Sequence, residues 1–85
     1  MDQQKFDADL IARVSLLEII ASVVMADRFR ADPNPQQSCD EWFDLVLKTH
    51  RDVASRATSP AERTMGAALI DAAAQLREST RSLLA

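Results

Sequence analysis

Gly66 is the only glycine among the 85 residues of this chain. Tight β-hairpin turns require positive backbone φ angles, which glycine adopts at much lower cost than other residues. A sheet built from several hairpins would therefore lack the residues that its turns need. The sequence predicts an all-α fold, and its length fits a single helical domain over residues 1–85.

Two breaks divide the helical periodicity into three segments. The first break, Ala31–Gln37, contains Pro33 and Pro35, each of which removes a backbone donor and restricts the residue before it. The second break covers residues 57–59. Because short connections make successive helices antiparallel neighbours, we expect an antiparallel three-helix bundle. Its helices are expected over about residues 4–30, 39–57 and 60–84.

Two capping boxes mark the expected starts of the second and third helices. In each box a serine can accept from the amide three residues later, while the glutamate there reaches back to the serine amide. The boxes are Ser38 with Glu41 and Ser59 with Glu62. Pro60 strengthens the second box, because its missing N–H costs nothing at the first helical position.

The expected second and third helices each carry one apolar face at steps of three and four residues. The face over residues 39–57 consists of Trp42, Phe43, Val46, Leu47, His50, Val53, Ala54 and Ala57. The face over residues 60–84 consists of Met65, Ala68, Leu69, Ala72, Leu76 and Leu83. We expect these two faces to form the core.

The first helix is apolar over more than half of its circumference. Phe6, Leu10, Val14, Leu17, Ala21 and Val24 form one stripe, and Leu16, Ile19, Ile20 and Val23 extend it. Only Ser15, Glu18 and Ser22 form a polar strip, which we expect to face solvent. This surplus predicts a homodimer with Leu16, Ile19, Ile20 and Val23 at the interface. The alternative is that this helix lies between the other two.

A second candidate interface lies on the third helix, where Arg63, Ile70, Arg77 and Arg81 recur along one side. Arginine and aliphatic side chains are the energetic centres of many protein interfaces. We predict that these four residues bind a partner protein. The alternative is an ordinary solvated face.

His50 and Cys39 are the remaining candidates for chemistry. His50 has no second histidine or glutamate at metal-ligand spacing, so we expect a buried structural histidine and no metal site. At the start of the second helix the dipole favours a Cys39 thiolate, whereas Asp40 and Glu41 oppose it. We expect an inert thiol at the rim of the core.

Charge and hydropathy exclude several functions. The net charge of −3 argues against a surface that binds the phosphate backbone of nucleic acids. Residues 1–7 contain no apolar run of the kind found in a secretory signal. The most apolar stretch, Leu16–Ala26, has about half the length that a membrane-spanning helix requires. A lone cysteine fits a reducing compartment. We expect a cytoplasmic protein with no membrane segment.

The sequence contains no catalytic signature and implies no cofactor. It predicts a non-enzymatic helical interaction module, a homodimer that regulates, adapts or inhibits another protein. One alternative is a bundle that binds haem or another apolar ligand around His50, Trp42 and Met65. Another is a helix-turn-helix DNA-binding protein formed by the second and third helices, although its first helix would be longer than usual.

Overall fold

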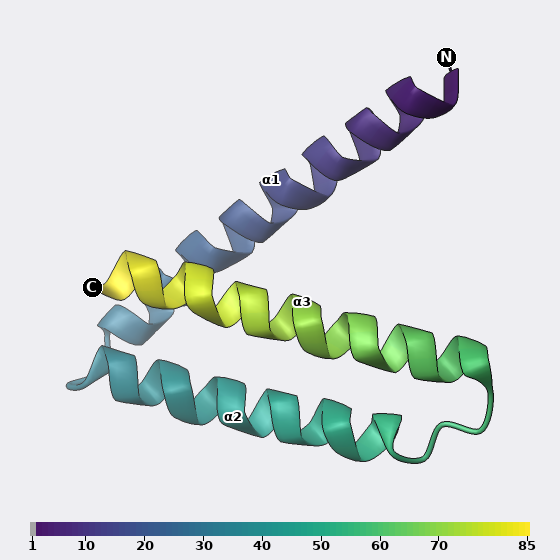
Figure 1. Cartoon of the computed structure of the whole chain (residues 1–85). Coiled ribbons are helices and arrows are strands. Elements are labelled where there is room, and N and C mark those ends of the chain that lie inside the picture. Colours follow the sequence, from purple (N-terminus) through teal and green to yellow (C-terminus); the bar gives the residue numbers. More distant parts are fainter. Residues whose placement is uncertain (1) are drawn as a thin grey trace.

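A computed structural model describes residues 2–85 of the chain. Within this range it contains three helices and no strand (Figure 1): α1 (Asp2–Arg30), α2 (Pro35–Ala54) and α3 (Pro60–Leu84). The all-α expectation is confirmed. The bounds of α3 agree with the expected helix, whereas α2 begins and ends earlier than expected.

The predicted capping box at Ser38 is wrong, because α2 begins at Pro35. The Ser38 amide donates to the Asn34 carbonyl at 3.1 Å, so Ser38 already lies inside the first helical turn. Asn34 is the N-cap residue, and its side-chain amide donates to Gln37. Proline fits the first turn of a helix, because the amide that it lacks would have no intrahelical partner there. Pro35 therefore starts the helix that the sequence analysis placed after it.

The cap of α3 is confirmed in its main contact. The Glu62 amide donates to the Ser59 side-chain oxygen at 3.1 Å. The Glu62 carboxylate accepts from the Thr58 amide at 3.0 Å rather than from Ser59. Both bonds satisfy amides that have no partner within the helix, so the start of α3 is fixed from both sides.

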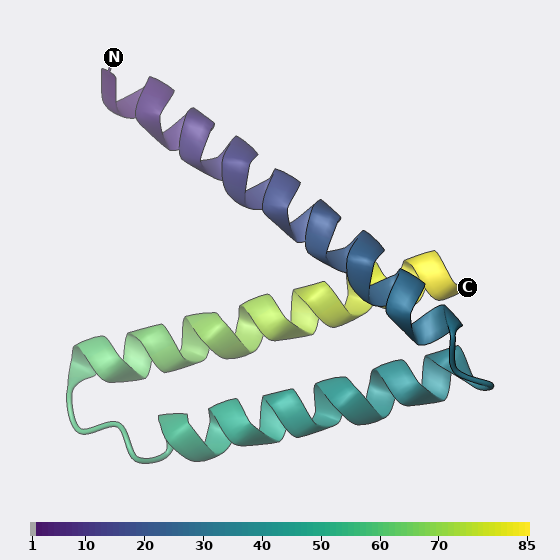
Figure 2. The same ribbon diagram turned by 180° about the vertical axis from the view of Figure 1, so that it is seen from behind.

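Helices α2 and α3 lie side by side and run in opposite directions, as Figures 1 and 2 show. The single glycine lies at their contact. A Cβ atom built on Gly66 would be 2.9 Å from the Cβ of Ala54. Gly66 has no positive φ angle, so its role is to permit close approach of the two helices rather than to form a turn.

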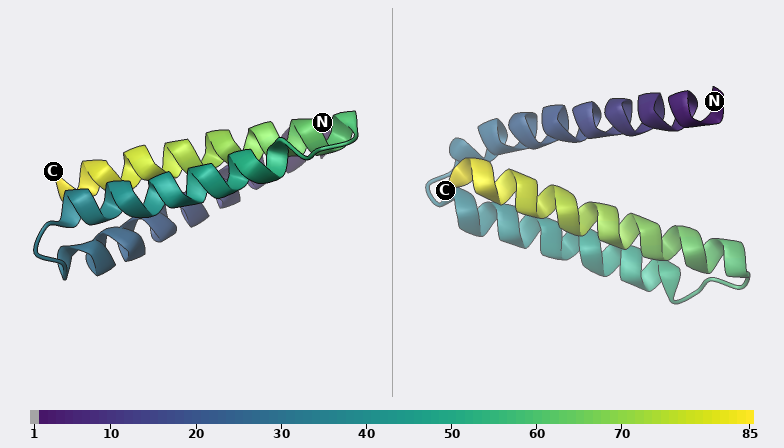
Figure 3. Two further views of the ribbon diagram at one scale, coloured as in Figure 1. Left: turned by 90° about the horizontal axis from the view of Figure 1, so that it is seen from below. Right: turned by 45° about the horizontal axis from the view of Figure 1, so that its top comes forward.

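Helix α1 packs against this hairpin only through its C-terminal part (Figures 1 and 3). Its N-terminal part extends away from α2 and α3. The radius of gyration is 15.4 Å, compared with about 12 Å for a compact domain of this length. The molecule is 14 Å thick along its shortest axis. Three helices pack together, but α1 does not run along the others as in the expected bundle.

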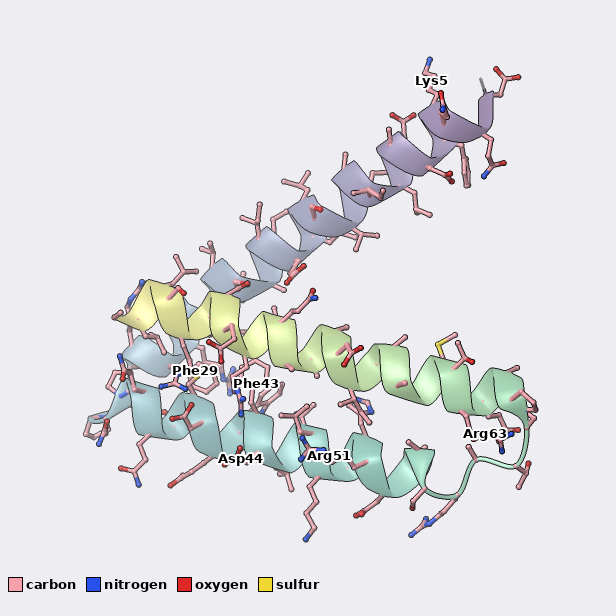
Figure 4. The ribbon with its side chains drawn as sticks, viewed as in Figure 1. Lys5, Phe29, Phe43, Asp44, Arg51 and Arg63 are labelled. Atoms are coloured by element: carbon pink, nitrogen blue, oxygen red, sulfur yellow. The ribbon has the colours of Figure 1, made fainter. Side chains whose placement is uncertain are left out.

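The core lies where the three helices meet. Phe29 of α1 packs there with Cys39 and Phe43 of α2, as the labelled phenylalanines in Figure 4 show. Met25, Leu76 and Leu84 surround this cluster. The Trp42 ring meets Phe43 edge-on at 4.9 Å and Phe29 at 6.4 Å between centroids. This small aromatic cluster joins α1 to the hairpin.

The expected apolar faces are confirmed only near this cluster. Phe43 and Leu47 are buried, but Trp42 and Val53 are exposed. On α3 the predicted stripe is largely uncovered, and Met65 is 61% exposed. This difference arises because the divergence of α1 leaves the first half of α3 without a helix against that stripe.

Candidate interaction surfaces

Helix α1 exposes an apolar surface that the rest of the chain does not cover. Ten of its large apolar side chains are between 50% and 66% exposed. They are Phe6, Leu10, Ile11, Val14, Leu16, Leu17, Ile19, Ile20, Val23 and Val24. A patch this large on a small protein is typical of a surface that binds another macromolecule.

The total accessible surface area of the chain is larger than that of a compact monomer of the same mass. It is 6522 Å², compared with about 5,000 Å² for a compact monomer of 9.4 kDa. The excess of roughly 1,500 Å² is larger than the ~800 Å² that each partner buries in a stable interface. One chain alone therefore exposes enough surface for a stable interface.

The polar strip of α1 faces the hairpin, which is opposite to the expectation. Ser22 is only 2% exposed, and its hydroxyl donates to the Glu18 carbonyl at 2.8 Å. Glu18 is half-buried and lines the groove between α1 and α3 with Ser79. Small and polar residues permit a close helix crossing at this point. With part of the polar strip inside, the large apolar side chains from Phe6 to Val24 stay at least half exposed.

All four residues of the predicted dimer interface are on this exposed surface: Leu16, Ile19, Ile20 and Val23. Ile19 and Val23 also line the groove beside Leu83 of α3. The structure thus brings the four side chains onto one continuous part of α1.

The four residues of the predicted partner surface on α3 have different environments. Arg63 is exposed near the start of the helix (Figure 4), whereas Ile70 is half-buried. Arg77 lies 3.5 Å from Asp44 of α2. Arg81 lies 3.4 Å from Asp40 of α2. Arg77 and Arg81 therefore form ion pairs between α3 and α2. Arg63 is the member of the set most accessible to a partner.

His50 and Cys39 differ from their expected burial. His50 is half-buried rather than buried. Cys39 is fully buried in the core rather than at its rim. Burial, reinforced by the neighbouring Asp40 carboxylate, raises the pKa of the Cys39 thiol, although Arg81 and Arg77 oppose this effect. A buried, protonated thiol is a poor nucleophile.

The residues named for apolar-ligand binding are not brought together. Met65 is exposed on the first half of α3. The pocket beside Trp42 is lined by Met25, Arg28 and Phe29, without His50 or Met65. Within residues 2–85 no cluster of three or more His, Cys, Asp or Glu side chains could hold a metal ion. No helix in this range has the length and hydropathy that a membrane span requires.

Comparison with protein-family models, with curated proteins and with solved structures found no match for this chain. Two further residues of α1 belong to its exposed apolar surface. Leu17 and Val24 are among the most exposed apolar residues of this helix, yet the predicted dimer interface did not include them. Their spacing of seven residues, shared with Leu10, was the signal for a helix-pairing surface.

Proposed function

We propose that this chain is a non-enzymatic protein–protein interaction module that acts as a homodimer and regulates, adapts or inhibits another protein. The observation that carries the proposal is the orientation of α1: Glu18 and Ser22 of its polar strip pack toward α3, while ten large apolar side chains remain exposed. In a domain this small, leaving such a surface in water would forgo several kcal/mol of stabilisation. The dimer interface includes Leu16, Ile19, Ile20 and Val23.

Several observations favour this function over the alternatives. The antiparallel arrangement of α2 and α3 differs from the crossing of about 90–120° in a helix-turn-helix motif. His50 and Met65 do not line a common pocket in the described part of the chain. A buried free thiol at Cys39 is compatible with the reducing cytoplasm, where we place the protein.

Light scattering coupled to size exclusion tests the homodimer. At micromolar concentration we expect twice the chain mass of 9.4 kDa. The double variant Leu16→Glu/Val23→Glu should be monomeric, because it introduces four charges into the symmetric interface. Leu45→Glu/Val53→Glu is the matched control, since both residues are exposed on α2. A monomeric wild type would refute the homodimer, and a dimer that survives Leu16→Glu/Val23→Glu would place its interface elsewhere.

Affinity capture from the native host, followed by mass spectrometry, tests the second half of the proposal. We expect one protein to be enriched by the wild type and depleted with Arg63→Glu, because Arg63 is the most accessible residue of the α3 set. If no protein is enriched over an unrelated helical bait, the proposed regulatory role is wrong.

A further inference from the structure

We infer that a second copy covers α1 by antiparallel pairing of the two α1 helices, in a register that places Arg13 of each copy opposite Asp27 of the other. This inference rests on the proposed homodimer and defines its geometry. It follows from three features of α1: the direction in which the helix is covered, the symmetry of its apolar residues and the placement of its charges.

The side of α1 that faces away from the hairpin is centred on Ile20. Phe29, which is buried against α2, lies nine residues later, or two and a half helical turns. The two side chains therefore point to opposite sides of the helix. A helix that packs on Ile20 meets the uncovered back of α1 and does not displace the contact with α2 and α3.

The apolar residues on this side are symmetric about Ile20. In an antiparallel pair in which residue 20 faces residue 20 of the second copy, each position faces the position at the same distance on the other side of the centre. Leu16 then faces Val24, and Leu17 faces Val23. All five side chains are at least 50% exposed in the single copy. Large apolar residues thus meet large apolar residues between positions 16 and 24.

The charges at the two ends of this apolar segment are opposite. Arg13 lies seven residues before Ile20 and Asp27 lies seven residues after it, so all three share one side of the helix. Both charged residues are exposed. The ion pairs found within residues 2–85 all involve arginines of α3, so the charges of Arg13 and Asp27 remain available.

These charges select the antiparallel direction. Antiparallel pairing forms two symmetric Arg13–Asp27 contacts, one at each end of the apolar segment. Parallel pairing in register would instead place Arg13 against Arg13 and Asp27 against Asp27, and like charges across an interface oppose association. The antiparallel helix dipoles favour the same direction.

Charge reversal in the full chain tests this register by sedimentation velocity at low salt. Arg13→Glu and Asp27→Arg should each raise the dimer dissociation constant about tenfold or more, because symmetry converts two attractive contacts into two repulsive ones. The double variant Arg13→Glu/Asp27→Arg restores opposite charges and should return to within about threefold of the wild type. Arg63→Glu, with the same change in net charge as Arg13→Glu, should have no effect. Circular dichroism verifies that each variant is folded.

Disulfide trapping tests the direction independently. A mixture of Arg13→Cys and Asp27→Cys chains should form a disulfide between residues 13 and 27, whereas Arg13→Cys alone should form none. The wild type is the control, because its only thiol, Cys39, is buried. Trapping of residue 13 with residue 13 would overturn the antiparallel direction.

The outcomes separate this inference from the homodimer proposal. A dimer that Leu16→Glu/Val23→Glu disrupts, but whose affinity no charge reversal changes, would refute the register and leave the homodimer in place. If the loss of dimerisation free energy in the double variant equals the sum of the losses in the two single variants, the register is also refuted. A wild type that is monomeric at every concentration would refute both.

Discussion

Replacing Gly66 with alanine tests whether α2 and α3 approach each other as closely as the structure requires. A Cβ atom at position 66 would lie 2.9 Å from the Cβ of Ala54 and 3.5 Å from its Cα. Neither atom belongs to a flexible side chain, so the helices themselves must move apart. Overpacking of this kind costs about 1–3 kcal/mol.

Helix propensity opposes this cost. Alanine is favoured over glycine inside a helix by about 0.5–1 kcal/mol. The net effect of Gly66→Ala should therefore be a loss of up to about 2.5 kcal/mol in the free energy of unfolding. The reverse exchange at the exposed neighbour, Ala67→Gly, should cost about 1 kcal/mol through propensity alone.

Urea denaturation followed by circular dichroism measures these changes, with all variants at one protein concentration because association contributes to stability. A second substitution, Ala54→Gly, removes the opposing Cβ and should recover most of the loss in a Gly66→Ala background. The diagnostic quantity is the coupling energy of this double-mutant cycle. A Gly66→Ala chain more stable than the wild type, with no coupling to position 54, would refute the close approach.

Three further predictions concern the core and the hairpin. Phe43→Ala should cost about 3–5 kcal/mol in urea denaturation because Phe43 is buried, while Leu45→Ala, at an exposed site on the same helix, should change stability by less than about 0.5 kcal/mol; equal effects would contradict the assigned core. Burial raises the pKa of the Cys39 thiol in the folded state, so stability should be constant below the unfolded value of about 8.5 and decline as the pH rises above it, and the decline should be absent in Cys39→Ala. Asp44→Asn should cost no more than about 1 kcal/mol, because the Asp44 side chain is 72% exposed, and a larger loss would show that its ion pair with Arg77 holds the hairpin together.

The sequence predicted the elements of this fold better than their arrangement. Local signals sufficed for α3, because Ser59, Pro60 and Glu62 act on backbone groups within one turn. The start of α2 was missed because proline both ends and begins helices, and Pro35 does the second. No local signal distinguishes the proline that ends one helix from the proline that begins the next in Pro33-Asn34-Pro35.

The orientation of α1 could not be derived from one chain. Its periodicity places Ser15, Glu18 and Ser22 on one strip, which a single-chain analysis assigns to solvent. The structure packs part of that strip against α3 and exposes the apolar side. A helix surrounded by partners on several sides has no unique outer face, so periodicity alone does not decide which side meets which partner.

Hydrogen exchange of the α1 amides at two protein concentrations tests most directly whether a second copy covers this helix. The N-terminal part of α1 extends away from α2 and α3 (Figure 3), and an isolated helix of about 15 residues is only marginally stable in water. We therefore predict strong protection of the amides between Leu10 and Leu17, which are exposed in a single copy, at high concentration. This protection should fall on dilution and in Leu16→Glu/Val23→Glu, while the amides around Phe43 keep theirs. Protection of α1 that changes neither with dilution nor with these substitutions would contradict the account.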